Sequence, residues 1–229
     1  RVHTFCCAVP GAWHVMGVTQ GAGLSLKWFR DNFCASEKET AASMGVDPYT
    51  LMDKEAEQSP IGCNRLLYLP YLMGERTPHL DPDCRGAFFG LSAMHTRRDL
   101  LRAVMEGVTY SLRDCVEILR GMGVEFGEML ACGGGGSSPL WRQMLADTFQ
   151  CPVKTVKSKE GPALGVAILA GVGAGLYPSV QQACDAMIQT SPPQDPIPGN
   201  VPQYEAYYQL YRTLYPAMKE SFQNLAKLG

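Results

Sequence analysis

The sequence lacks long hydrophobic runs, and this absence argues against a protein with membrane-spanning helices. No apolar stretch reaches the roughly 18 residues that a membrane span needs. The nearest candidate, residues 163–176, consists largely of glycine and alanine. A secretory or transit signal is missing as well. We therefore expect no membrane partner.

The sequence also lacks a large excess of charge of either sign, and its cysteines are not spaced as pairs. The 20 Lys and Arg residues nearly balance the 22 Asp and Glu residues, so the net charge of −2 gives no reason to expect nucleic acid as a partner. The nine cysteines are an odd number without C-x-x-C spacing. This pattern predicts reduced thiols in a cytoplasmic protein, with neither a disulfide framework nor a zinc site.

The chain begins at Arg1, without an initiator methionine, and enters a β-rich run directly. We interpret the sequence as a fragment that has lost N-terminal strands of its domain. Residues 2–8 and 13–18 flank a Pro-Gly turn and predict a β-hairpin, and a helix is expected over 21–33.

Strands and helices alternate further along the chain, which predicts an α/β layer with parallel strand pairing between residues 66 and 176. We expect one domain over residues 1–190, a Pro-rich connection over 191–203, and a C-terminal amphipathic helix within 204–229. The expected elements are helices at 36–44, after 47–48, 99–120, 140–149, 161–175 and 204–228, and strands at 66–69, 129–132 and 153–156.

The segment from residue 86 to residue 112 predicts a strand end followed by a capped helix. Gly86 and Gly90 bracket the strand end, while Thr96 is a good N-cap with Asp99 as its capping-box partner. Apolar residues recur at helical spacing and predict a long, half-buried helix. These positions are Leu100, Leu101, Val104, Met105, Val108 and Leu112.

Four glycines at 133–136 follow the expected strand 129–132. They lead to Ser138, a candidate helix cap, and to Pro139 at the first helical position. Only glycine lets a flat ring or a phosphate approach a backbone so closely. No Lys-Ser/Thr pair follows, so this is not a Walker A loop. A ligand site and a plain tight turn both remain open on this pattern alone.

Two other segments carry polar or small residues with weaker implications. The helix start at residues 21–28 could simply pack on a sheet with Trp28 buried. The acidic loop 74–86 matches no metal-binding spacing, and we expect a self-paired, solvated loop that orders the next helix. None of the four histidines has a partner for a nucleophilic triad. The tyrosines of the C-terminal helix are expected in core or interface packing.

Together these segments resemble the FGGY carbohydrate kinases. The second signature of that family fits Gly-x-Phe-x-Gly-Leu, seven residues, and then Asp-Leu-x-x-Ala-Val-Met-Glu in this chain. The matching residues are Gly86, Phe88, Gly90, Leu91, Asp99, Leu100, Ala103, Val104, Met105 and Glu106. Within the family, the loop PYLMGERTPHLDP and the start HTFCCAVPGAWHVMGV are most similar to the xylulokinase branch.

The resemblance implies an α/β, actin-like (ribonuclease H-like) ATPase domain, the C-terminal one of the family's two. It assigns Gly133, Gly134, Gly135 and Ser138 to the adenine or ribose of ATP. Gly23 and Lys27 would lie near the ATP phosphates, with Lys27 as a point charge. Mg²⁺ would accompany the nucleotide. The family's catalytic Asp and its phosphate-holding Gly-Thr loop lie upstream of the matching segment, so no catalytic residue is assigned here.

We therefore expect the nucleotide-binding domain of an ATP-dependent sugar kinase, with ATP and a small ketopentose as partners and no kinase activity in this chain alone. Two alternatives stay open. The chain could belong to a gluconate- or ribulose-type branch of the family, or it could be a non-catalytic actin-like module that forms a homodimer through its C-terminal aromatic helix.

Overall fold

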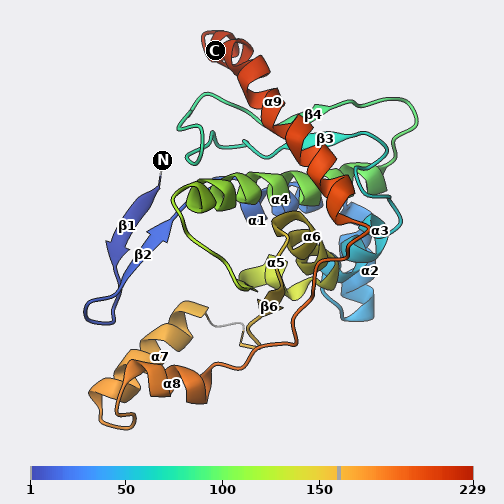
Figure 1. The fold of residues 1–229 in the computed structure, drawn as a ribbon. Helices are drawn as coiled ribbons and strands as arrows, with labels where there is room; N and C mark the ends of the chain where they lie inside the picture. The colour runs from blue at the N-terminus through green and yellow to red at the C-terminus, as the bar shows by residue number, and fades with distance from the viewer. Residues whose placement is uncertain (1, 159–160, 229) are drawn as a thin grey trace.

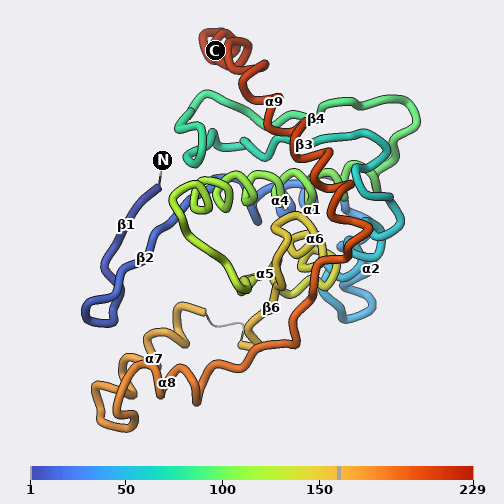
Figure 2. Tube along the Cα trace, in the orientation of Figure 1, coloured from blue at the N-terminus to red at the C-terminus, as the bar shows by residue number. Residues whose placement is uncertain are grey.

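The computed structural model describes residues 2–158 and 161–228. Figures 1 and 2 show a body built around the long helix α4, with two segments that project on the same side and with the C-terminal end of the long helix α9 extending beyond the body. The helices are α1 (Ala22–Phe33), α2 (Ala35–Met44), α3 (Pro48–Ala56), α4 (Arg97–Gly121), α5 (Gly133–Ser137), α6 (Pro139–Phe149), α7 (Gly161–Gly173), α8 (Val180–Met187) and α9 (Val201–Leu225). The strands are β1 (His3–Cys6), β2 (Trp13–Met16), β3 (Leu67–Leu69), β4 (Ala87–Phe89), β5 (Met129–Ala131) and β6 (Val153–Thr155).

Helix α4 lies at the centre of the hydrophobic core and contacts α1, α3, α6, α9 and β3. Its start is as predicted, because the Asp99 carboxylate accepts from the backbone N–H and the hydroxyl of Thr96, each at 2.8 Å. The prediction of a half-buried helix is wrong, since residues 101–111 are all buried. Polar residues on the face of α4 that was expected to be exposed are buried as well, because they bond to one another. Arg102 and Glu106, for example, form an ion pair at 2.8 Å.

The strands of the described residues form three two-stranded sheets. The expected hairpin is confirmed, with β1 antiparallel to β2. Strands β5 and β6 are parallel, as expected for strands joined through a helix. The expectation of parallel pairing fails for β3, which runs antiparallel to β4. No helix separates β3 from β4, and a loop alone can return the chain for antiparallel pairing.

The C-terminal helix α9 packs against β3, α4 and α6 of the same chain (Figure 1). Its buried side chains include four tyrosines, Tyr204, Tyr208, Tyr211 and Tyr215. Their hydroxyls bond to residues of the body; for example, Tyr204 accepts from Arg102 at 3.0 Å and Tyr215 donates to Asp81 at 2.8 Å. The aromatic face of this helix therefore packs inside its own chain.

Asp114 couples α4 to α9 and makes the stability of this contact depend on pH. Burial raises the pKa of its carboxyl to about 6, although the Tyr208 hydroxyl donates to it at 2.8 Å. A carboxyl whose pKa rises on folding favours the folded state when it is protonated. This contribution, about 3 kcal/mol for a shift of this size, is lost as the pH rises from about 4 to about 6.

We expect Asp114→Asn to raise the free energy of unfolding by about 1–3 kcal/mol at pH 8 and by clearly less at pH 4.5. Asparagine keeps an oxygen that accepts from Tyr208 but cannot ionise. Chemical unfolding at the two pH values measures the difference. An equal effect of the substitution at both pH values would contradict the assigned pKa.

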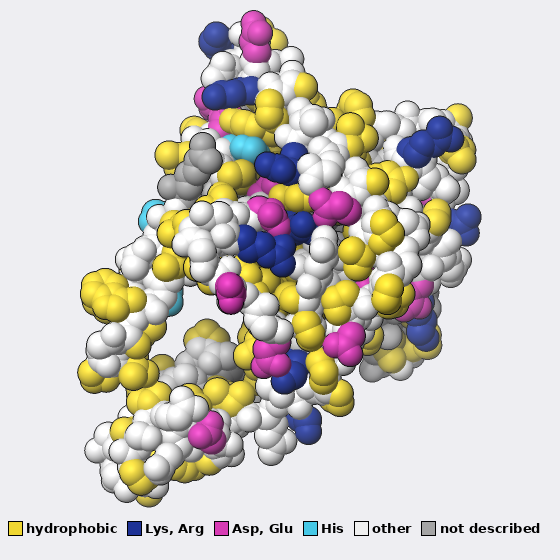
Figure 3. All heavy atoms as spheres, viewed as in Figure 1, with side chains coloured by type: hydrophobic (Ala, Val, Ile, Leu, Met, Phe, Trp, Pro, Cys, Tyr) yellow, Lys and Arg dark blue, Asp and Glu magenta, His cyan; other side chains and the backbone are white. Residues whose placement is uncertain are grey.

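Two segments project from the body, the β1–β2 hairpin and the pair α7–α8. Figure 3 shows both, with hydrophobic side chains along them and an opening between them in this view. Trp13 of the hairpin is 65% exposed and Val166 of α7 is 67% exposed. Among the described residues, no helix combines the length and the apolar character needed to cross a membrane.

Candidate functional site

The glycine segment lies at the carboxyl end of β5, beside the end of the parallel strand β6. The Thr155 hydroxyl donates to the carbonyl of Ala131 at 2.8 Å and ties the two strand ends together. The expected strand, glycine segment and helix are all present. However, the glycines form the short helix α5, Gly133–Ser137, rather than a plain tight turn. Cys132 precedes α5 as its N-cap residue and makes no side-chain capping bond.

The four glycines differ in how far the fold alone accounts for them. Gly133 has a φ of +75°, which disfavours any other residue. A Cβ at Gly136 would lie 2.3 Å from the Ala131 carbonyl oxygen, and one at Gly135 would lie 3.1 Å from the Trp141 ring. A Cβ at Gly134 would meet no atom within 4 Å. Packing within the described residues therefore does not account for Gly134.

Ser138 caps α6, as predicted. Its hydroxyl accepts from the backbone N–H of Trp141 at 3.0 Å, and Pro139 is the first residue of the helix. The carboxylate of Asp53 on α3 lies beside Ser138; burial raises the pKa of this carboxyl, and the nearby Ser138 hydroxyl opposes the rise. Ser138 is thus held on two sides by the protein, and its contact with a ligand stays a prediction.

The second group of predicted residues lies on α1. Gly23 and Lys27 are both exposed, and a Cβ at Gly23 would meet open space. The glycine that α1 needs for packing is Gly21, where a Cβ would lie 1.8 Å from the carbonyl oxygen of Pro70. Trp28 is half-buried, not buried, with its ring edge-on to Phe33 at 5.3 Å.

The structure does not join the two groups directly. Across residues 2–158 and 161–228, neither a hydrogen bond nor an ion pair links Lys27 or Gly23 to the glycine segment. Helix α1 packs on α4, whereas α5 packs on β5 and α6. Gly133, Gly134, Gly135 and Ser138 therefore form one compact cluster, and Gly23 with Lys27 forms a separate exposed face.

The acidic loop is self-paired, as expected, through mutual backbone bonds between Glu75 and Asp81 at 2.8 Å and 2.9 Å. It is solvated only in part, because these two residues are buried whereas Arg76, Asp83 and Arg85 are exposed. Glu75 is 3% exposed and accepts from the Thr19 hydroxyl at 2.7 Å and from the backbone N–H of Gln20 at 2.8 Å. Burial nevertheless raises the pKa of its carboxyl, and these bonds oppose the rise. Within the described part of the chain, no three His, Cys, Asp or Glu side chains gather as metal ligands would.

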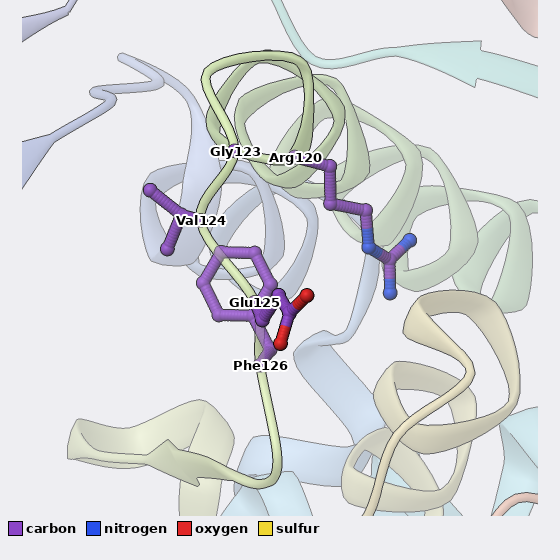
Figure 4. A pocket seen from close by; sticks show the side chains of 5 residues that line it. All are labelled: Arg120, Gly123, Val124, Glu125 and Phe126. Atoms are coloured by element: carbon purple, nitrogen blue, oxygen red, sulfur yellow. The ribbon is translucent and has the colours of Figure 1, made fainter.

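Two shallow hollows lie away from the predicted residues. Figure 4 shows one, which is lined by Arg120 and by residues 123–126 of the loop that follows α4. The other is formed by side chains of α2 and α3 together with Arg97. Arg97 is occupied there by ion pairs with Glu37 and with Glu55. Neither hollow contains a residue of the glycine segment or of the exposed face of α1.

Sequence reasoning missed three polar side chains around the glycine segment. Asp53 reaches Ser138 from α3, Arg142 donates to the carbonyl of Gly136 at 2.6 Å, and Gln194 accepts from Arg142 at 2.7 Å. Arg142 follows the glycine segment by one helical turn, which is a signal that could have been used. Asp53 and Gln194 are distant in sequence, and no local pattern indicates them.

Comparison with known proteins agrees with this fold. The family model described as "FGGY family of carbohydrate kinases, C-terminal domain" matches residues 2–174. Xylulose kinase of Staphylococcus epidermidis is 39% identical over 96% of this chain and 42% of its own length. Gluconokinase of Bacillus subtilis is 34% identical over 97% of this chain and 44% of its own length.

A solved structure shows the same arrangement of elements. Ligand-bound xylulose kinase from Lactobacillus acidophilus superposes with a TM-score of 0.81 and 27% identity, over 97% of this chain and 43% of that one. The chain thus spans less than half the length of the relatives that it matches. The fold class inferred from the sequence is confirmed, and the chain belongs to the FGGY family of carbohydrate kinases, as its C-terminal domain.

Proposed function

We propose that this chain is the nucleotide-binding domain of an ATP-dependent kinase that phosphorylates D-xylulose. The observation that carries the proposal is the similarity to xylulose kinase, 39% identity over 96% of the chain, against 34% for gluconokinase. The exposed apolar side chains on the β1–β2 hairpin and on α7 support a domain that works beside further polypeptide, because such surfaces often mark interaction sites.

The glycine segment fits a flat, uncharged ring. At Gly134 the backbone faces open space, so an adenine ring can lie against it without meeting a side chain. A Cβ at Gly133 would likewise meet no atom within 4 Å, whereas one at Gly135 would lie 3.1 Å from the Trp141 ring. We assign the adenine or ribose to Gly133, Gly134, Gly135 and Ser138, whose hydroxyl also caps α6.

The exposed face of α1 fits the charged end of the nucleotide. Lys27 is exposed and forms no ion pair within the described residues, although Asp31 one turn along α1 feels its charge. This charge would attract phosphate oxygens. Gly23 leaves room beside it. ATP supplies the phosphoryl group, and Mg²⁺ is proposed to arrive with the nucleotide, because the described residues form no carboxylate cage for it. We assign to this chain the binding and orientation of the nucleotide, and we assign none of its described residues as the base for the sugar hydroxyl.

A gluconate kinase is the second candidate, favoured by the 34% identity to gluconokinase. The dimerisation module loses its main support, because Tyr204, Tyr208, Tyr211 and Tyr215 are buried against the chain's own body.

The test is a coupled assay of ADP release with D-xylulose, D-ribulose and gluconate. We expect the full-length kinase that carries this domain to turn over D-xylulose with the highest kcat/KM. The chain of residues 1–229 should give no turnover at any enzyme concentration. Preference for gluconate would move the protein to the second candidate. Turnover by the 229-residue chain would contradict the proposal that this chain only binds and orients the nucleotide.

A further inference from the structure

We propose that Arg142 and Gln194 form a brace that holds α5 in the conformation that receives the nucleotide. The brace is defined by these two side chains and by the carbonyls of Gly136 and Pro139 that they bind. Both residues act through the glycine segment and are positioning residues. The inference rests on the proposed adenine seat at Gly134.

Helix α5 cannot maintain its own conformation. It has five residues, four of them glycine, whereas isolated helices need about 12–15 residues even with good helix formers. Each glycine in a helix costs about 0.5–1 kcal/mol relative to alanine because its backbone loses more freedom. Contacts from outside α5 must therefore hold its conformation. Without them, a nucleotide would have to order α5 on binding, and this cost would weaken its affinity.

The brace supplies such contacts through a closed set of hydrogen bonds. Arg142 donates from Nη1 to the Gly136 carbonyl at 2.6 Å and from Nε to Oε1 of Gln194 at 2.7 Å. Gln194 in turn donates from Nε2 to the Pro139 carbonyl at 3.1 Å. These bonds connect the end of α5, the start of α6 and the Pro-rich connection.

Gln194 is itself fixed to the sheet. Its backbone N–H and carbonyl both pair with Val153 of β6, at 2.9 Å and 3.0 Å. The family model ends at residue 174, so this side of the brace comes from a segment beyond the matched domain. The segment after α8 is thus more than a connection to α9, because it completes the support of the glycine segment.

The competing explanation is that Arg142 contacts a phosphate of ATP directly. The variant Arg142→Lys distinguishes this explanation from the brace. Lysine keeps the positive charge, but its single ammonium nitrogen does not reproduce the fixed spacing of Nε and Nη1 with which Arg142 contacts Gln194 and the Gly136 carbonyl. If Arg142 attracts phosphate by charge, Arg142→Lys keeps the ATP affinity. If it acts as a brace, Arg142→Lys weakens binding nearly as much as Arg142→Ala does.

The experiment measures two quantities on the 229-residue chain. Amide hydrogen exchange of residues 133–138 without nucleotide reports the order of α5, and calorimetric titration with Mg-ATP reports affinity. In Arg142→Ala and Gln194→Ala we expect exchange at 133–138 to become about tenfold faster and ATP binding to become about tenfold weaker. Gln194→Glu keeps an acceptor for Arg142 and should lose less affinity than Gln194→Ala.

Arg98→Ala and Gln182→Ala are the matched controls, because both side chains are exposed on helices away from the brace. They should change neither quantity. Unchanged exchange at 133–138 in the brace variants would overturn the inference, and so would faster exchange with unchanged ATP affinity. If the wild-type chain orders α5 through the brace but binds no ATP, the proposed nucleotide seat fails and the nucleotide role of the brace fails with it.

Discussion

Replacing Gly107 by alanine is expected to lower the free energy of unfolding by about 2–3 kcal/mol. Gly107 lies in the middle of α4, where the helix crosses β3. A Cβ there would lie 2.2 Å from the carbonyl oxygen of Tyr68 and 3.0 Å from its carbonyl carbon. Tyr68 is itself buried, so neither the helix nor the strand can move aside without opening the core. Equilibrium unfolding in urea measures the loss.

Gly121 provides a matched control within the same helix. It is the last residue of α4, and a Cβ there would meet no atom within 4 Å. Because alanine favours helix by up to about 1 kcal/mol over glycine, Gly121→Ala should leave stability unchanged or raise it slightly. Similar losses in both variants would mean that the approach of α4 to β3 is not as close as the structure has it.

This contrast shows what the sequence could and could not predict about α4. The start at Thr96 and the apolar spacing of Leu101, Val104 and Val108 are local patterns, and the structure confirms them. The burial of Arg102 and Glu106 depends on partners from α9 and from the turn before β3. Charged residues are seldom buried unless paired, so the sequence alone favoured an exposed second face.

The glycine segment shows the same limit at the candidate site. The order of strand, glycines, cap and helix was predictable because each step depends on neighbouring residues. The sequence could not predict which of the glycines is needed for packing. The atoms that leave no room for a Cβ at Gly136 belong to Ala131 at the end of β5 and to the Thr155 hydroxyl of β6. The role of Gln194 could not be predicted either, because only tertiary folding brings the Pro-rich connection to α5.

Gly134→Val is expected to remove most of the nucleotide affinity while leaving the fold intact. The valine side chain would enter the open space at this position and occupy the proposed seat of the adenine ring. We expect Mg-ATP binding to weaken by about 100-fold, equivalent to about 3 kcal/mol. The fold should tolerate the change, because valine is no worse than glycine in a helix. Calorimetric titration of the 229-residue chain and its thermal unfolding measure the two effects.

Two further glycine variants decide how the result is to be explained. Gly136→Ala puts a Cβ 2.3 Å from the Ala131 carbonyl oxygen, so it should damage stability whether or not a nucleotide binds. Gly121→Val adds the same bulk in open space far from the glycine segment and should change neither stability nor affinity. Loss of affinity in Gly134→Val with a normal unfolding transition can then come only from the ligand side of Gly134. Unchanged affinity in that variant would mean that the glycine segment serves packing alone and that the adenine binds in another part of the domain.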